Sequence, residues 1–170
     1  FPKKDENSAL DYYQKAANLG NEVSIYNIGR FYEYGRVLNK NIDSAFSCYT
    51  IAANNNYDYA MYNLAKLYNS TTKFLNIDSA NFWYNRAANL GNSDAMLSLA
   101  NYYYNTNLDS TFFWYSKALD KKNIYAEYNI GILYANTNYK NYNCDSAYKW
   151  FNKALTSKYN YALIDIGDCY

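Results

Sequence analysis

The 170-residue chain contains no histidine, and this absence excludes several kinds of active site at once. Ser-His-Asp and Cys-His catalysis both need an imidazole, and so does every metal site that uses histidine ligands. Cysteine is also scarce: three residues lie far apart in the sequence and form no Cys-x-x-Cys motif. The sequence therefore indicates no metal site and no disulfide framework. Unpaired cysteines favour a reducing intracellular compartment, although the sequence does not decide the compartment.

An excess of charge of one sign and long hydrophobic runs are missing as well. The 16 Lys and Arg residues nearly balance the 15 Asp and Glu residues, for a net charge of +1. This balance argues against binding nucleic acid or anionic membranes through bulk charge. No apolar run approaches the roughly 18 residues of a membrane-spanning helix, so we expect no membrane insertion in this segment. No signal-peptide pattern is visible and the chain begins with Phe1, so we expect a processed protein or a piece of a longer one.

Proline and glycine are scarce, whereas tyrosine and asparagine are abundant. One proline and six glycines stand against 24 tyrosines and 27 asparagines. An AT-rich genome would produce this bias through its codons, and selection for a tyrosine-lined binding surface would raise tyrosine too. Only the positions of the tyrosines can therefore argue for a function.

Two sequence motifs alternate along the chain. The first, Asn-apolar-Asp-Ser followed by Ala or Thr, occurs at 41–45, 76–80, 107–111 and 143–147, with a weaker copy at 7–9. Successive copies lie 36, 35, 31 and 36 residues apart. The second reads Ala-x-Tyr-Asn-Leu/Ile-Gly/Ala-x-x-Tyr in its fullest form and occurs at 24–32, 60–68, 95–103, 126–134 and 162–170. Five aligned copies identify an internal repeat.

Both motifs have the spacing of amphipathic helices. Ala45, Tyr49, Ala52 and Ala53 fall on one helical face, and Ala60, Leu64, Leu67 and Tyr68 do the same in the second motif. The Asp-Ser pair that opens the first motif is typical of an N-cap, and glycines at 20, 35 and 91 suit left-handed helix ends. The unit is therefore a helical hairpin of about 35 residues, which buries its apolar faces by stacking on neighbouring hairpins.

The sequence predicts an all-α solenoid of stacked antiparallel hairpins, with about four full repeats and a half-repeat at each end. We call the helix of the second motif helix A and that of the first motif helix B. The repeats are expected at 23–55, 59–90, 94–121 and 125–157, with half-repeats at 7–19 and 162–170, in a single domain spanning 1–170. A solenoid end normally needs a polar outer face, so we expect flanking repeats or a partner to cover both ends.

The motifs resemble those of the Sel-one-like repeat (SLR) family, a relative of the tetratricopeptide repeat. The resemblance is close at 80–88, which reads Ala-Asn-Phe-Trp-Tyr-Asn-Arg-Ala-Ala, and at Tyr62-Asn63-Leu64. It holds also at Tyr128-Asn129-Ile130-Gly131 and at 150–154, and it covers essentially the whole chain. The 31-residue interval departs from the pattern because the loop between 103 and 109 is about five residues shorter than its counterparts.

The resemblance implies a right-handed superhelix that binds proteins without catalysis or a cofactor. Members of the family are adaptors and scaffolds, among them subunits of membrane-protein degradation complexes, regulators of cell-wall synthases and bacterial proteins that act on host cells. The function expected is therefore an interaction scaffold, acting alone or as one subunit of a larger assembly. The partner expected is a protein that supplies an extended peptide or a helix.

Helix A normally lines the concave face of such stacks, so its positions outside the packing pattern are candidates for partner contact. Six of the ten outward positions are tyrosine, and a cation follows one turn later in two repeats. The candidates are Tyr26, Arg30, Tyr59, Tyr62, Lys66, Tyr125, Tyr128 and Tyr161. Tyr26, Tyr62 and Tyr128 belong to the family pattern, so for them packing and partner contact stay equally open. For the other three tyrosines the placement favours contact.

Two other functions compete with the scaffold. Tyrosine rows could stack on the bases of single-stranded RNA, but the net charge of +1 argues against it, and no nucleic acid is expected. An enzyme would need a base other than histidine, and neither paired carboxylates nor a glycine-rich phosphate loop is present. The sequence therefore favours the scaffold over both.

Overall fold

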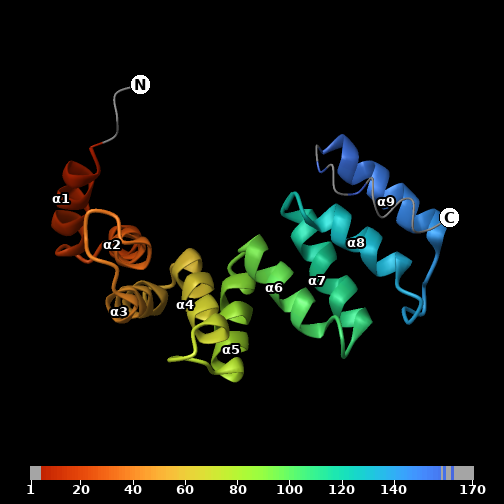
Figure 1. The fold of residues 1–170 in the computed structure, drawn as a ribbon, viewed down its shortest axis with the longest axis horizontal. Helices are drawn as coiled ribbons and strands as arrows, with labels where there is room; N and C mark the ends of the chain where they lie inside the picture. The colour runs from red at the N-terminus through yellow and green to blue at the C-terminus, as the bar shows by residue number, and fades with distance from the viewer. Residues whose placement is uncertain (1–4, 158, 160–161, 163–170) are drawn as a thin grey trace. The chain divides into compact units, whose positions relative to one another are not determined.

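The computed structural model describes residues 5–157, 159 and 162, and within them the chain forms nine α-helices and no β-strand (Figure 1). The all-α prediction is therefore confirmed. The helices are α1 (Glu6–Ala17), α2 (Glu22–Tyr34), α3 (Ile42–Asn54), α4 (Asp58–Ser70), α5 (Ile77–Asn89), α6 (Ser93–Tyr103), α7 (Leu108–Asp120), α8 (Ala126–Ala135) and α9 (Cys144–Thr156).

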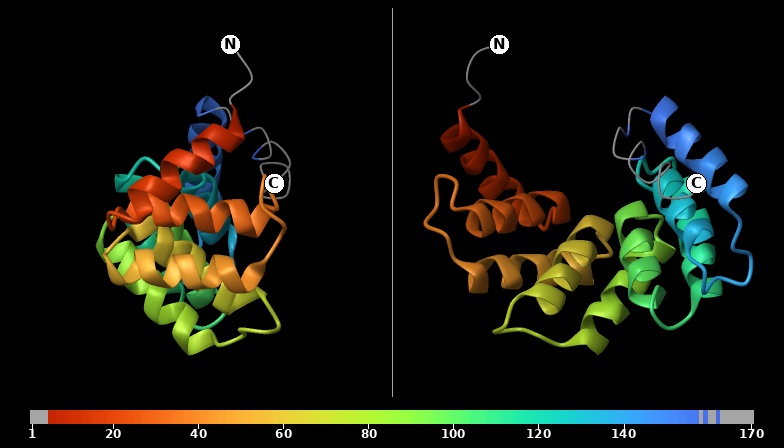
Figure 2. Two further views of the ribbon diagram at one scale, coloured as in Figure 1. Left: turned by 90° about the vertical axis from the view of Figure 1, so that its left-hand side faces the viewer. Right: turned by 45° about the vertical axis from the view of Figure 1, so that its right-hand side comes forward.

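The chain forms two compact units, which we call the N-terminal unit (Phe1–Asn92) and the C-terminal unit (Ser93–Tyr170). Within each unit every helix packs against the next one along the chain (Figure 2). The hairpins are α2–α3 and α4–α5 in the first unit, and α6–α7 and α8–α9 in the second. Each hairpin consists of one helix A followed by one helix B, as the repeat predicts. No helix in the described residues is both long and apolar enough to cross a membrane.

Four B helices, α3, α5, α7 and α9, begin at an asparagine cap, and this corrects the expected N-cap. The Oδ1 atom of Asn41 accepts a hydrogen bond from the Ser44 backbone N–H at 3.0 Å, and α5, α7 and α9 repeat the arrangement. The sequence interpretation placed the cap on the Asp-Ser pair. That pair instead lies in the first helical turn, where the aspartate complements the helix dipole. The asparagine is the cap because its backbone is extended, whereas the next two residues are already helical.

Four B helices, α1, α3, α5 and α7, are followed by a residue with a left-handed backbone. Gly20 and Gly91 have φ angles of 85° and 98°, as expected, and Gly35 closes α2 with φ 67°. Asn56 and Lys122 occupy the same repeat position as Gly20 and Gly91, with φ angles of 63° and 58°. The turn after helix B therefore keeps one geometry even where the residue is not glycine.

Helices A and B meet where a small residue faces an aromatic ring. A Cβ atom added to Gly29 of α2 would lie 2.8 Å from the ring of Tyr49 in α3. One added to Gly131 of α8 would lie 2.6 Å from the ring of Phe151 in α9. Both rings are fully buried. The missing Cβ is therefore what allows the two helices to approach this closely.

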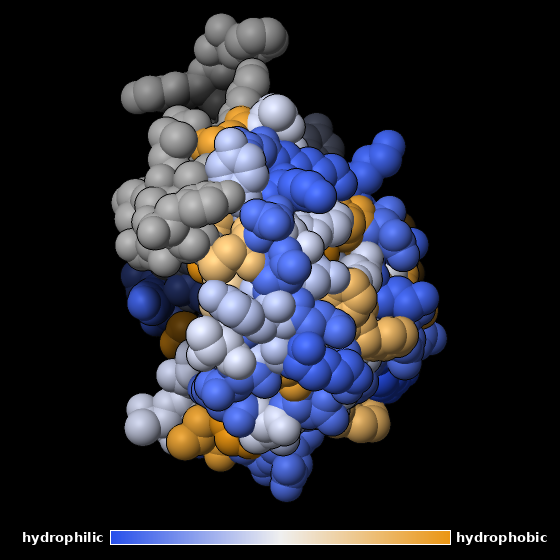
Figure 3. Space-filling model, turned by 90° about the vertical axis from the view of Figure 1, so that its right-hand side faces the viewer, coloured by the Kyte–Doolittle hydropathy of each residue, from blue (hydrophilic) through white to orange (hydrophobic). Residues whose placement is uncertain are grey.

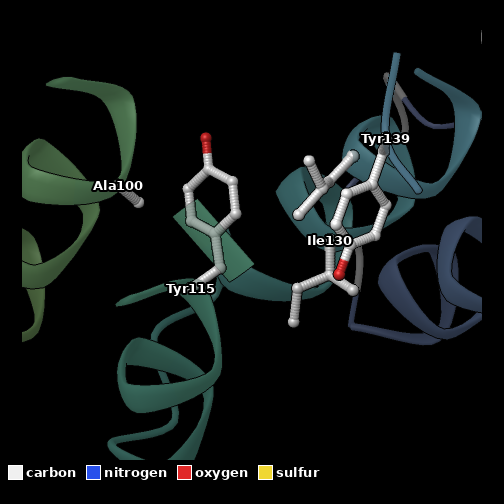
Figure 4. Close-up of a cluster of buried hydrophobic side chains, with 5 residues drawn as sticks. Ala100, Tyr115, Ile130 and Tyr139 are labelled. Atoms are coloured by element: carbon white, nitrogen blue, oxygen red, sulfur yellow. The ribbon is translucent and has the colours of Figure 1, made fainter. Parts of the chain in front are cut away.

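The C-terminal unit shows how neighbouring hairpins share a core. Tyr115 of α7 points into the space between Ala100 of α6 and Ile130 of α8, with Tyr139 of the α8–α9 loop beyond (Figure 4). These four residues are at most 3% exposed. The hydroxyl of Tyr115 donates to Asn101 Oδ1 at 2.7 Å, so the ring is buried without leaving its polar end unpaired.

Two A–B loops, α4–α5 and α8–α9, fasten their hairpins to the preceding helix B. Lys73 of the α4–α5 loop contacts Asp43 at the start of α3 at 2.5 Å, while the neighbouring Phe74 stacks on Phe46 at 4.3 Å between centroids. In the C-terminal unit the α8–α9 loop repeats this arrangement, with a lysine–aspartate distance of 2.6 Å and an aromatic stack at 6.4 Å; its residues are Lys140, Asp109, Tyr139 and Phe112. One lysine–aspartate pair and one aromatic stack thus recur in both units.

The A–B loop of the third hairpin differs from the others. Its A–B loop is residues 104–107, shorter than the loops 35–41, 71–76 and 136–143, in agreement with the 31-residue interval. The loop contains no lysine, and Asn81 replaces phenylalanine at the matching position of α5. The deletion therefore removed a loop segment while leaving both helices of the hairpin intact.

The glycine–ring contact predicts the effect of adding one methyl group. Alanine in place of a helical glycine normally stabilises a helix by about 1 kcal/mol. For Gly131→Ala we expect the opposite, a loss of about 1–3 kcal/mol in the free energy of unfolding, because the buried Phe151 ring has no room to move. Urea unfolding followed by circular dichroism measures the change.

A double variant checks the cause of that loss. Phe151→Leu alone should destabilise by removing buried ring atoms. Combined with Gly131→Ala it should cost less than the sum of the two single changes, because the smaller side chain leaves space for the new methyl group. Additive losses would show that the ring contact is not the reason for the glycine.

Candidate functional site

The predicted contact residues divide between the two units. Tyr26 and Arg30 lie on α2, and Tyr59, Tyr62 and Lys66 lie on α4 of the N-terminal unit. In the C-terminal unit Tyr125 immediately precedes α8 and Tyr128 lies on its first turn. Tyr161 lies outside the described residues. Each unit therefore carries its own candidate residues.

Three tyrosines gather on the N-terminal unit, and we call them the N-terminal tyrosine cluster. The ring of Tyr57, in the α3–α4 loop, lies 5.1 Å from the ring of Tyr26 and 5.7 Å from that of Tyr59. The centroids of Tyr26 and Tyr59 are 6.4 Å apart. Tyr59 is 52% exposed, and the other two rings are partly exposed. The cluster therefore presents aromatic area and phenol oxygens at the surface.

The two predicted cations lie beside tyrosine rings. The guanidinium carbon of Arg30 is 5.9 Å from the centroid of Tyr26, and Lys66 Nζ is 5.6 Å from the centroid of Tyr62. Both distances are within the range of cation–π attraction. The N-terminal tyrosine cluster therefore continues into a positively charged side chain at Arg30.

The tyrosine of the Tyr-Asn motif in helix A packs on the inner aromatic ring of helix B in three of the four hairpins. Ring centroids are 5.6 Å apart for Tyr26 and Tyr49, 5.9 Å for Tyr62 and Tyr84, and 5.9 Å for Tyr128 and Phe151. Burial, the largest cause, raises the pKa of Tyr26 to about 12, and Asn63 donates to its hydroxyl at 3.4 Å. These tyrosines therefore pack on the core and keep one side partly exposed.

A second cluster lies on the C-terminal unit, and we call it the C-terminal tyrosine cluster. The ring of Tyr159 lies 5.7 Å from that of Tyr125 and 4.8 Å from that of Tyr128. Tyr125 is 43% exposed, and Tyr128 also packs against the core residues of α9. Each unit therefore exposes a group of three tyrosines.

Tyr57 and Tyr159 are the members of the clusters that sequence reasoning missed. They occupy the same repeat position, in the turn just before helix A, whereas the sequence predictions were drawn from positions expected within helix A. The other copies have asparagine there: Asn92 donates to Asp58 at 2.9 Å, and Asn123 donates to Asp94 at 2.9 Å. Aligning this turn position across the repeats would have separated the two tyrosine copies from the asparagine copies.

The described surface offers aromatic and polar contact area. Among the described residues no group of three or more Cys, Asp or Glu side chains is arranged to hold a metal ion. On the face drawn in Figure 3 hydrophilic side chains predominate, and hydrophobic ones form small separate patches. Such a surface suits contacts that combine aromatic area with hydrogen bonds.

A family model for the Sel1 repeat matches residues 2–21, 23–57, 58–92 and 124–159. The chain belongs to the Sel1 repeat family. The matched segments leave out 93–123, which contains the α6–α7 hairpin with the shortened loop. The hairpin left out of the match is thus the one with the shortest A–B loop, although both of its helices are formed.

Solved structures support the Sel1 fold. A Sel1 repeat protein from Oxalobacter formigenes superimposes with a TM-score of 0.86 at 25% identity, covering 99% of this chain and 71% of that protein. A protective antigen of uropathogenic Escherichia coli strains, which displays an SLR fold, gives 0.88 at 22% identity and covers 99% and 37%. An immunity protein from Pseudomonas aeruginosa gives 0.63 at 18% identity and covers 94% and 60%. Curated protein sequences give no significant match.

Sel1 repeat proteins are in general scaffolds for protein–protein interaction, and the family is generally non-catalytic. The helical-repeat fold predicted from the sequence and the family resemblance are both confirmed by these findings. The binding residues themselves stay a prediction.

Burial of the packed tyrosines predicts alkaline unfolding. Desolvation raises the pKa of Tyr26 to about 12 and also raises the pKa values of Tyr49 and Tyr115. Because unfolded tyrosine ionises near pH 10, this contribution to stability is complete below pH 10 and is lost as the pH rises towards 12. Helicity followed by circular dichroism should therefore fall over this interval. Phenolate absorbance that reaches its full amplitude while helicity is intact would contradict the prediction.

Proposed function

We propose that this Sel1 repeat chain is a non-enzymatic interaction scaffold whose tyrosine clusters bind a partner protein. The observation that supports the proposal is the exposure of Tyr59 and Tyr125, which are 52% and 43% exposed while their neighbours in the repeat pack on the core. The partner would supply an extended peptide segment or a helix. The whole chain would act as a single solenoid domain, as one subunit of a larger assembly.

The physical argument rests on what a tyrosine cluster offers a partner. A tyrosine ring presents a large rigid contact area and loses little conformational entropy on binding, and its hydroxyl can donate or accept a hydrogen bond. In both clusters the half-buried rings are already held by packing on α3 and α9. Binding would therefore order few additional side chains, which lowers its entropic cost.

Serine substitutions on the exposed rings test the proposal. Tyr59→Ser and Tyr125→Ser remove contact area while leaving the core rings in place, so we expect at least a tenfold loss of partner affinity with unchanged helicity. Partners are identified by affinity purification of the wild-type chain after nuclease treatment, and each is then titrated against the purified variants.

Two other exposed tyrosines provide matched controls. Tyr12 of α1 is 72% exposed and Tyr102 of α6 is 47% exposed, and neither belongs to a cluster. Tyr12→Ser and Tyr102→Ser should bind within about twofold of the wild type. A partner that binds the Tyr59→Ser and Tyr125→Ser variants as tightly as the wild type would move the interface away from the clusters. A partner removed by the nuclease would point to RNA instead.

A further inference from the structure

A small pocket lies between α1 and α2 of the N-terminal unit, where these helices run beside each other (Figure 2). Its volume is about 180 Å³, and Glu6 and Tyr13 of α1 line one side. Arg30 and Tyr34 of α2 line the other side, together with Arg36 of the following loop. This volume is below that of a drug-sized site but is sufficient for one short side chain.

The pocket concentrates the arginines of the chain. The sequence contains three arginines, and two of them, Arg30 and Arg36, line this pocket. Their guanidinium carbons lie 5.9 Å and 6.0 Å from the centroid of the same ring, that of Tyr34. The aromatic ring therefore holds both guanidinium groups at the pocket.

Arg30 lies beside two tyrosine rings. Its guanidinium carbon is 5.9 Å from the centroids of both Tyr26 and Tyr34, within the range of cation–π attraction. The N–H donors of a guanidinium lie in its plane, where they match the geometry of a carboxylate. Arg30 therefore has the donor geometry to bind an anion at the pocket.

The charge at the pocket is only partly balanced. Arg36 lies 3.6 Å from a carboxylate oxygen of Glu6, a loose pair between exposed side chains. Within the described part of the chain, no carboxylate lies within 4 Å of the Arg30 guanidinium. Among the described residues, Arg30 of the pocket thus has no acidic partner within ion-pair distance.

We propose that this pocket binds the side-chain carboxylate of an acidic residue in the partner peptide. The inference rests on the proposed function, because Arg30 contacts Tyr26 and so joins the pocket to the N-terminal tyrosine cluster. A peptide whose apolar or aromatic residues lie on that cluster would place a nearby Asp or Glu at Arg30. The pocket therefore gives the partner a chemical class: an acidic segment with neighbouring apolar residues.

The experiment begins with a peptide library displayed on phage and selected on the 170-residue chain. An enriched peptide is synthesised with a free and with an amidated C-terminus, and again with its acidic residue changed to the amide. Affinities are measured by fluorescence anisotropy for the wild type and for Arg30→Gln. We expect acidic residues among the selected peptides and about a tenfold weaker affinity for Arg30→Gln.

Arg86→Gln is the matched control. Arg86 of α5 also stacks on aromatic rings, at 5.9 Å from Phe82 and 5.1 Å from Trp83, and donates to Asn56 at 3.0 Å. Its substitution removes the same charge at a different surface, so peptide affinity should stay within about twofold of the wild type. The amide peptide should lose about as much affinity as Arg30→Gln causes, and combining the two changes should add little further loss.

Three outcomes would overturn the inference. Arg30→Gln could bind the acidic peptide as tightly as Arg86→Gln does, or the amide peptide could bind as tightly as the acidic one. Affinity could also fall on C-terminal amidation but not on the acid-to-amide change, which would assign the site to a terminal carboxylate. The proposed function fails separately, when the selected peptides bind Tyr59→Ser as tightly as the wild type.

Discussion

The structure depends on one contact, the aromatic ring of helix B packed against a residue of helix A that has little or no side chain. Gly29 faces Tyr49 and Gly131 faces Phe151 at distances that leave no room for a Cβ atom. Since a hairpin of this size cannot bury its apolar faces alone, this close approach creates the interior that the neighbouring hairpins then extend. The same rings also hold the proposed contact residues, because Tyr26 packs on Tyr49.

The contacts between successive hairpins tolerate more sequence variation than the contact between the two helices of one hairpin. The α4–α5 and α8–α9 loops both reach the preceding helix B through a lysine–aspartate pair and an aromatic stack. Exposed ion pairs contribute little to stability, so most of the stabilisation at these loops comes from the rings. The α6–α7 loop is shorter and contains no lysine, and its hairpin still forms, with Tyr115 packed between Ala100 and Ile130. A shorter loop is therefore compatible with the repeat.

The fold could be predicted from the sequence because the same pattern occurs several times along the chain. Helix type, order and approximate bounds follow from periodicities that recur in each copy, so a local ambiguity in one copy is resolved by the others. The N-caps were placed wrongly because Asn41 and the Asp43-Ser44 pair are all good capping residues. The choice between them depends on where the backbone leaves the extended region, with ψ 102° at Asn41, and the motif carries no information on that angle.

The site was less predictable than the fold for a related reason. Positions within helix A project in directions set by the helical period, so Tyr59 and Tyr125 could be placed at the surface in advance. Tyr57 lies in a turn whose geometry is set by the left-handed backbone of Asn56, and its direction does not follow from a period. Residues of α1, α2 and the following loop together line the pocket at Arg30, so no single sequence motif predicts it.

The repeat places two positions with different constraints side by side on helix A. The residue at the first position is small in every described copy: Gly29, Ala65, Ala100 and Gly131. The next residue differs in every copy, being Arg30, Lys66, Asn101 and Ile132. Two of these take part in the interior of the C-terminal unit, because Asn101 accepts a hydrogen bond from the Tyr115 hydroxyl and Ile132 packs against the core. Arg30 is instead exposed beside two tyrosine rings, so in that copy the charge can change without disturbing the core.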